Sequence, residues 1–136
     1  MRYINIHRLT ELPDIAYLAP FKAVISVEEQ VSEQRQVEIS AWLVGMGCRY
    51  VMVCCENCGS WCNSVRRANL ELFDIDTMSA KDFVMTTVHR YESLKAVFWY
   101  AKRAAKHPEI HFKDCVVLHL ANGDRSAEYQ SLYHRA

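Results

Sequence analysis

The sequence predicts an α/β fold, a three-layer sandwich around a small, mainly parallel four-stranded sheet. Apolar runs alternate along the chain with stretches of helical periodicity, and short connections join them. The runs are apolar throughout, as expected of strands that are buried on both faces. Strands separated by helices imply right-handed crossovers between parallel neighbours, as in flavodoxin-like or Rossmann-like topologies.

Four runs rich in β-branched residues are the predicted strands. The first, residues 21–27, follows Pro20, and the second covers residues 50–55. The third and fourth cover residues 83–88 and 115–120.

Three helices are predicted between these strands. The first runs from an N-cap at Ser32 to Met46, and the second from a cap at Ser60 to about Phe73. The third begins near Ser93, or at Glu92 before it, and ends before Pro108. The apolar residues expected to face inward are Val37, Ala41 and Val44 in the first helix, Val65, Ala68, Leu70 and Leu72 in the second, and Leu94, Val97, Phe98, Ala101 and Ala105 in the third.

The chain length is that of one domain. We expect an N-terminal arm over residues 1–20, with an optional short strand at 3–7. A single α/β domain then covers residues 21–121. The polar segment 122–136 is predicted to be a loose C-terminal tail or a short final helix.

Composition narrows the function classes. Hydrophobic residues make up 51% of the 136 residues, and the net charge is zero. Zero charge argues against nucleic-acid binding, which depends on attraction to phosphates. Charged residues interrupt the first 20 positions, and no apolar stretch is long enough for a membrane helix. We therefore expect a cytoplasmic protein, with its six cysteines mostly reduced and its oligomeric state open.

Polar residues gather after the predicted strands. Ligands of parallel sheets bind at the carboxyl ends of the strands, so these loops are where a site is expected. The candidate binding residues are Glu28, Glu56, Asn57, Ser60, Trp61, Thr87, His89 and Glu92.

Nucleotide-binding and hydrolase signatures are missing from the sequence. It contains neither a Gly-x-Gly-x-x-Gly turn nor a phosphate loop, and no Gly-x-Ser-x-Gly elbow. We expect no cofactor and assign no catalytic residue.

Four cysteines fall within nine positions: Cys54, Cys55, Cys58 and Cys62. Cys55 and Cys58 form a Cys-x-x-Cys at a strand-to-helix turn, where helix N-termini lower thiol pKa values, although Glu56 opposes thiolate formation. A redox pair is therefore one hypothesis. A second is zinc bound by Cys55, Cys58, Cys62 and His89. The interpretation we favour is that these are ordinary buried or loop thiols, with no metal.

His89 and the tryptophans have alternative interpretations. His89, three residues before Glu92, is either a general base or a loop residue with internal hydrogen bonds. Trp61 flanks a ligand, anchors a partner or caps the sheet edge. Trp42 and Trp99 are expected to pack in the core or on helix faces, and Trp99→Ala to destabilise more than Trp61→Ala or His89→Ala.

The chain resembles a family of uncharacterised bacterial proteins, a domain of unknown function, from Pro20 to about Ala121. The residues that carry the resemblance are Ala41-Trp42-Leu43-Val44, Ser60-Trp61, Ser64-Val65, Ala68-Asn69, Phe83-Val84-Met85-Thr86-Thr87, His89, Phe98-Trp99-Tyr100-Ala101-Lys102 and His107-Pro108. The resemblance implies the fold and no particular activity. Cys62-Asn63, Val88 and Arg90 depart from the acidic and aromatic residues expected there, which argues against an enzyme using those carboxylates.

Three functions follow in order of preference. The first is a non-catalytic module that binds another protein, such as an immunity or antitoxin partner that neutralises a toxin. The second is a small enzyme or ligand-binding protein that uses a cleft at the strand ends. The third is a zinc or redox module on the cysteine loop.

Overall fold

The computed structural model describes residues 1–56 and 58–136 and has a five-stranded sheet at its centre. The strands are β1 (Arg2–Ile6), β2 (Phe21–Val27), β3 (Cys48–Cys54), β4 (Met85–Val88) and β5 (Asp114–Leu120). Their order is β1-β5-β2-β3-β4, and every neighbouring pair is parallel. The α/β class and the parallel sheet are confirmed.

The sheet has five strands, one more than the four predicted. The optional strand near the N-terminus is β1, which pairs with β5 from Arg2↔Val116 to Ile6↔Leu120 and forms one edge of the sheet. Counted from β2, the four predicted strands lie in the order 3-2-1-4, which is the order of the first four strands of the Rossmann fold, and β1 is added at the edge beside β5. The chain adds β3 and β4 on one side of β2, then returns to place β5 on the other side.

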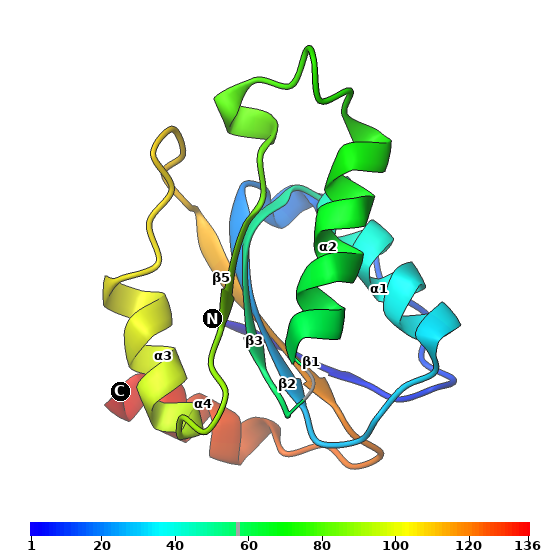
Figure 1. Cartoon of the computed structure of the whole chain (residues 1–136). Helices are drawn as coiled ribbons and strands as arrows, with labels where there is room; N and C mark the ends of the chain where they lie inside the picture. Colours follow the sequence, from blue (N-terminus) through cyan, green and yellow to red (C-terminus); the bar gives the residue numbers. More distant parts are fainter. Residues whose placement is uncertain (57) are drawn as a thin grey trace.

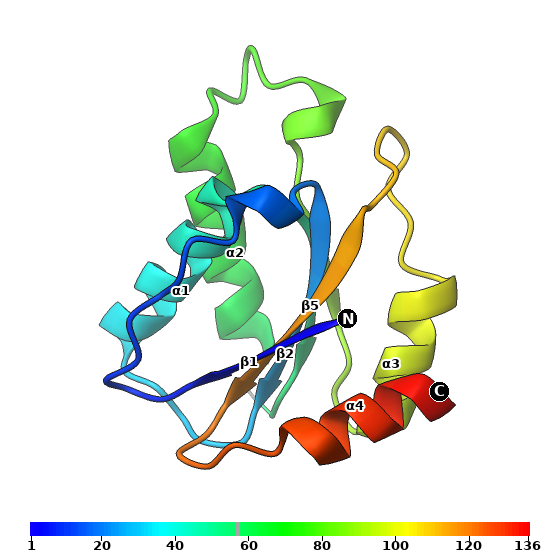
Figure 2. The ribbon, with the colours of Figure 1, turned by 180° about the vertical axis from the view of Figure 1, so that it is seen from behind.

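Four helices cover the two faces of the sheet (Figures 1 and 2). They are α1 (Glu33–Gly45), α2 (Cys58–Leu72), α3 (Leu94–Arg103) and α4 (Ser126–Arg135), and two 3-10 turns lie at Ala16–Leu18 and Ala80–Asp82. Helices α1 and α2 lie side by side on one face, and α3 and α4 lie on the other. Segment 126–135 is thus a helix packed on the sheet.

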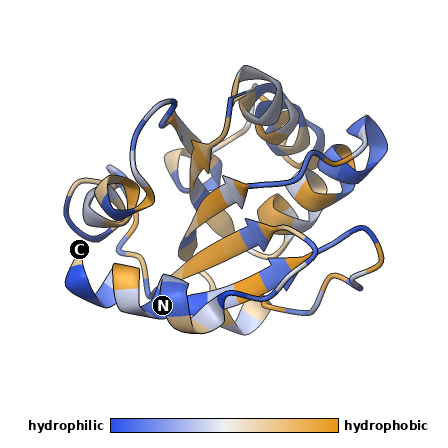
Figure 3. Cartoon of the chain, turned by 90° about the horizontal axis from the view of Figure 1, so that it is seen from below, coloured by the Kyte–Doolittle hydropathy of each residue, from blue (hydrophilic) through white to orange (hydrophobic). Residues whose placement is uncertain are grey.

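Both faces of the sheet are apolar, which explains why the central strands show no polar alternation (Figure 3). Val24 and Ile25 are consecutive in β2 and both fully buried. Ile25 packs with Leu43 of α1, while Val24 packs with Phe98 of α3 in a separate cluster on the opposite face. A strand covered on both faces has no position left for a solvent-facing polar residue.

Two of the three predicted helix N-caps are confirmed, and one is wrong. The Ser32 hydroxyl accepts a hydrogen bond from the backbone N–H of Arg35 at 3.1 Å, and that of Ser93 accepts one from Ala96 at 3.1 Å. The prediction that Ser60 caps the second helix was wrong, because α2 already begins at Cys58. The Ser60 hydroxyl instead accepts a hydrogen bond from another helix.

The buried face of α1 is rotated about the helix axis relative to the predicted one. Val37 is 40% exposed, whereas Gln36 is buried and donates from Nε2 to the hydroxyls of Ser60 (2.9 Å) and Ser64 (2.8 Å) on α2. Because α1 packs against α2 as well as the sheet, a polar side chain occupies an inward position. A purely apolar periodicity does not detect such a position.

The far end of α2 also differs from the prediction. Leu70 and Leu72 are about half exposed, and Asn69 is the buried residue there. Its side chain donates to the carbonyl of Asp82 (2.8 Å) and accepts from the N–H of Val84 (3.1 Å), so it fastens the segment that leads into β4.

Within residues 1–56 and 58–136, no helix is both long and apolar enough to span a membrane.

Candidate functional site

A cleft of about 740 Å³ opens at the carboxyl ends of the strands. Figure 3 looks at this edge of the molecule. Ser26 and Cys54, near the ends of β2 and β3, line the cleft together with residues from the loops that follow β2, β3 and β4. Helix α4 supplies Glu128, Tyr129 and Leu132.

The path of the chain explains the position of the cleft. After β2 and β3 the chain turns towards the face that carries α1 and α2, but after β4 and β5 it turns towards the face that carries α3 and α4 (Figures 1 and 2). Loops that leave neighbouring strands in opposite directions separate and leave a crevice, which is where parallel sheets bind ligands.

The structure brings most of the predicted site residues together. Glu28, Glu56, Trp61, His89 and Glu92 all line the cleft. Two others contact residues of its wall: Ser60 is bonded to Gln36, and Thr87 to His89. The prediction for Asn57 lies outside the described residues.

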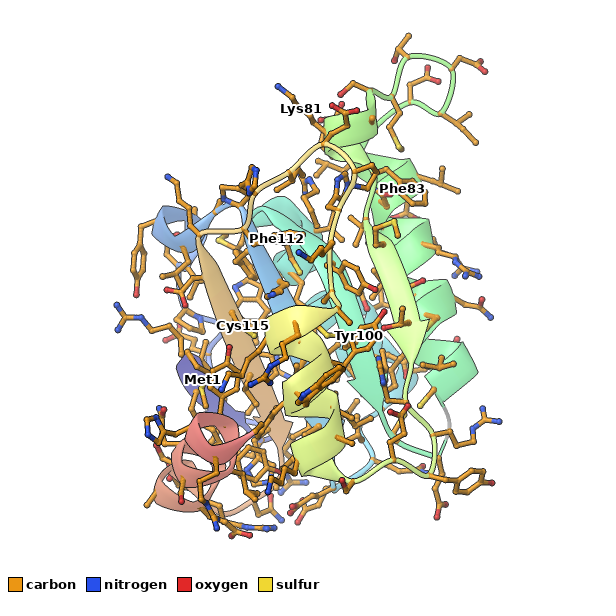
Figure 4. All side chains as sticks on the ribbon, turned by 90° about the vertical axis from the view of Figure 1, so that its left-hand side faces the viewer. Met1, Lys81, Phe83, Tyr100, Phe112 and Cys115 are labelled. Carbon is orange, nitrogen blue, oxygen red and sulfur yellow. The ribbon has the colours of Figure 1, made fainter. Side chains whose placement is uncertain are left out.

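The two ring nitrogens of His89 are both engaged. Nδ1 lies 2.9 Å from Oε2 of Glu92, and Nε2 lies 2.7 Å from the hydroxyl of Thr87. A neutral ring with its proton on Nδ1 donates to the carboxylate and accepts from the threonine. The ring packs edge-on against Tyr100 of α3, with centroids 4.7 Å apart. Tyr100 is labelled in Figure 4.

Because His89 is only 5% exposed and its nitrogens are engaged, its contacts are those of a loop residue with internal hydrogen bonds. Its backbone N–H also donates to the carbonyl of Val53 at 2.9 Å, extending the pairing of β4 with β3. His89 therefore holds the turn between β4 and α3 in place beside the cleft.

A second polar cluster forms between β2, β5 and α4. Oε2 of Glu28 lies 3.1 Å from Nε2 of His119, which is fully buried in β5. The other ring nitrogen of His119 lies 2.5 Å from the hydroxyl of Tyr3 on β1. Oε1 of Glu28 accepts hydrogen bonds from Arg125 and, at 3.3 Å, from the Tyr129 hydroxyl. These contacts join β1, β5, the end of β2 and the start of α4 at one end of the cleft.

These contacts determine the ionisation of the Glu28 carboxyl. Burial raises the pKa of Glu28, but the hydrogen bond and charge of His119, together with Arg125 and Tyr129, outweigh it. The pKa of Glu28 therefore lies below its ordinary value, and the group is ionised at neutral pH. Burial likewise raises the pKa of Tyr129 to about 12, so its phenol stays neutral.

Arg125 is held by two carboxylates. Its Nε and Nη2 atoms each lie 2.8 Å from an oxygen of Glu128, and its Nη1 contacts Glu28. Arg125, Glu128 and Tyr129 were not among the predicted site residues, because segment 122–136 was expected to be either a loose tail or a short final helix and was given no place at the cleft. Tyr129, Leu132 and Tyr133 recur at helical spacing there, which is the signal that would have revealed α4.

Trp61 and Trp99 are buried in the reverse of the expected order. Trp61 is 3% exposed and packs in the core beneath the cleft, whereas Trp99 is 51% exposed on α3. Of the two placements expected for Trp99, the core is wrong, because Val97, Phe98 and Ala101 form the inner face of that helix. Trp99 instead stacks with Arg103, whose guanidinium carbon lies 5.5 Å from the ring.

The alternative zinc site is not assembled. Among the residues that the structure describes, no three His, Cys, Asp or Glu side chains are arranged to hold a metal ion. Of the proposed ligands Cys55, Cys58, Cys62 and His89, the histidine uses both nitrogens elsewhere. The sulfur atoms of Cys55 and Cys58 lie 3.4 Å apart.

Residues 1–136 match the family described as Domain of unknown function (DUF7684). The chain belongs to this family. No curated protein and no solved structure matches the chain. In this DUF7684 member, two of the segments that carried the resemblance lie at the cleft: Ser60-Trp61 in the first turn of α2, and His89 after β4.

Proposed function

We propose that this protein binds a small polar molecule with a positively charged amine in the cleft at the carboxyl ends of its strands. The observation that carries the proposal is the cleft itself, about 740 Å³ in size at the point where the loops diverge. This was the second of the three functions considered from the sequence.

The charge around the cleft supports a cationic ligand. Four carboxylates line it, from Glu28, Glu56, Glu92 and Glu128, against the two guanidinium groups of Arg90 and Arg125. The carboxylates therefore outnumber the guanidinium groups by two, four against two. A cleft lined by one sign of charge raises the local concentration of ligands of the opposite sign.

The engaged side chains support binding in preference to catalysis. His89, Glu28 and Arg125 are held by neighbouring side chains of the protein itself. Within the described residues, Glu56 is a cleft carboxylate with no hydrogen bond or ion pair to the protein. A ligand amine therefore has one carboxylate available without displacing a contact.

The test is isothermal titration calorimetry of the full chain with putrescine and spermidine, with citrate as the anionic control. We expect saturable binding of the amines, weakened about tenfold or more by Glu56→Gln and left unchanged by Glu71→Gln, an exposed carboxylate on α2 outside the cleft. Tighter binding of citrate than of either amine, or no binding of the amines, would contradict the proposal.

A protein partner is the second candidate, and the exposed apolar side chains near the cleft favour it. Tyr91 is 93% exposed at the cleft rim with a φ of 65°, a conformation that non-glycine residues rarely adopt, and Val88 and Trp99 are about half exposed nearby in the chain. Aromatic residues are common anchors of interfaces. This candidate includes a role as an immunity or antitoxin protein that binds a toxin in the bacterial cytoplasm.

The test of the second candidate is co-purification with the products of adjacent genes. A stoichiometric complex that is lost on Tyr91→Ala but retained in Leu9→Ala, an exposed residue elsewhere, supports it. A complex unaffected by Tyr91→Ala rejects this surface as the interface.

A further inference from the structure

Cys55 and Cys58 are placed differently with respect to solvent. Their sulfur atoms lie 3.4 Å apart in the turn between β3 and α2. Cys55 is partly exposed and lines the cleft, whereas Cys58, the first residue of α2, is fully buried. A disulfide requires about 2.05 Å between the sulfurs, so they must approach by roughly 1.4 Å.

We propose that Cys55 and Cys58 form a reversible disulfide by exchange with a low-molecular-weight disulfide that enters the cleft. Cys55 is the residue that the incoming disulfide reaches, and Cys58 is the residue that resolves the mixed disulfide. This activity is separate from amine binding and does not depend on it.

The exchange balances with a disulfide such as oxidised glutathione as the oxidant. The Cys55 thiolate attacks one sulfur of this disulfide, forming a mixed disulfide and releasing one glutathione thiolate. The Cys58 thiolate then attacks the sulfur of Cys55 and releases the second glutathione thiolate. Two electrons pass from the protein to glutathione, and the two thiol protons end on the released glutathione thiolates.

The surroundings of Cys58 favour its role as the resolving thiol. It lies at the N-terminus of a 15-residue helix, whose dipole stabilises negative charge. The backbone N–H of Cys55 points at its sulfur, with 3.3 Å between the nitrogen and Sγ. Because the side chain is fully buried, an external disulfide reaches it only through Cys55.

The other cysteines are poorer candidates for this exchange. Cys54 also lines the cleft, but burial and the neighbouring thiols raise its pKa to about 12. Burial raises the pKa of Cys48 to about 12 and of Cys115 to about 11. Burial raises the pKa of Cys62 as well. Thiols with raised pKa values remain protonated and react slowly.

The test equilibrates the folded full chain with mixtures of oxidised and reduced glutathione, stops the exchange with acid, unfolds the chain, blocks all remaining thiols with a maleimide, and maps the products by mass spectrometry. We expect the protein to change from six labelled cysteines to four as the mixture becomes more oxidising, with one Cys55–Cys58 disulfide. Cys54→Ser and Cys62→Ser are the matched controls and should form the same disulfide.

The two roles predict an asymmetry between variants. Cys58→Ser should trap one glutathione on Cys55, and Cys55→Ser should leave Cys58 reduced and unmodified. Circular dichroism checks that each variant is folded. If Cys58→Ser does not fold, the result for Cys55→Ser alone decides between the outcomes. Six labelled thiols at every ratio, or a disulfide that persists in Cys55→Ser, would overturn the proposal. Because the measurement counts thiols without any amine, its outcome does not depend on the ligand test.

Discussion

Glu28, directly after β2, and His119 in β5 form a contact across the strand pair at which the sheet's loops diverge, with 3.1 Å between Oε2 and Nε2. The histidine is fully buried, and the carboxylate also contacts Arg125 of the segment leading into α4. This contact connects the core of the sheet to one end of the cleft, so its ionisation affects both stability and the charge of the cleft.

Replacing Glu28 should alter the acid stability of the protein. The folded pKa of Glu28 lies below its ordinary value of 4.5, so its stabilising contribution is fully present above about pH 4.5 and is lost as pH falls through the folded pKa. We expect Glu28→Gln to lower the melting temperature at pH 7 and to differ less from the wild type at pH 3. Thermal unfolding at both pH values measures this, and an equal difference at the two would contradict it.

Truncation of the two tryptophans should destabilise the protein to very different extents. Trp61 is buried beneath the cleft, and loss of a buried aromatic costs about 3 to 5 kcal/mol. Trp99 is half exposed, and changes at such surface positions usually stay within about 0.5 kcal/mol. Chemical unfolding should therefore show Trp61→Ala far less stable than Trp99→Ala, the reverse of the order expected from the sequence. Equal losses of unfolding free energy in the two variants would contradict this prediction.

Gly47 and Gly45 provide a matched pair at the end of α1. Gly47 has a φ of 103°, and an added Cβ would lie 2.4 Å from Cβ of Ala19, whereas nothing lies within 4 Å of a Cβ at Gly45. We expect Gly47→Ala to destabilise by about 1 to 3 kcal/mol or more, since strain and a clash combine. Gly45→Ala should be neutral or stabilise by up to about 1 kcal/mol. Urea unfolding of both variants measures the difference, and similar values for the two would contradict this account.

The central part of the fold could be predicted because burial on both faces leaves a direct signal. Val24 and Ile25 are apolar neighbours, and only a strand covered on two sides buries both. The capping serines Ser32 and Ser93 were found for a similar reason, since a cap is a local interaction. Strand β1 was only an optional expectation because its pairing with β5 joins residues more than 100 positions apart.

The candidate site was predictable in position but not in detail. The rule for parallel sheets brought Glu28, Glu56 and His89 to one edge, where they lie. The same rule does not say which side chains are engaged by neighbours, and the nitrogens of His89 are held by Thr87 and Glu92. Such contacts depend on side-chain packing in three dimensions, which the sequence pattern does not contain.

The most direct test of the account is to map amine binding onto the protein by nuclear magnetic resonance. Spermidine is titrated into the ¹⁵N-labelled full chain, and the amide shifts of wild type and Glu56→Gln are compared. Our account predicts that the largest changes fall in residues 54–56, 89–92 and 125–129, the segments that line the cleft, and that they shrink in Glu56→Gln. Changes spread evenly over the acidic surface, or confined to residues outside the cleft, would contradict the claim that this edge of the sheet is the binding site.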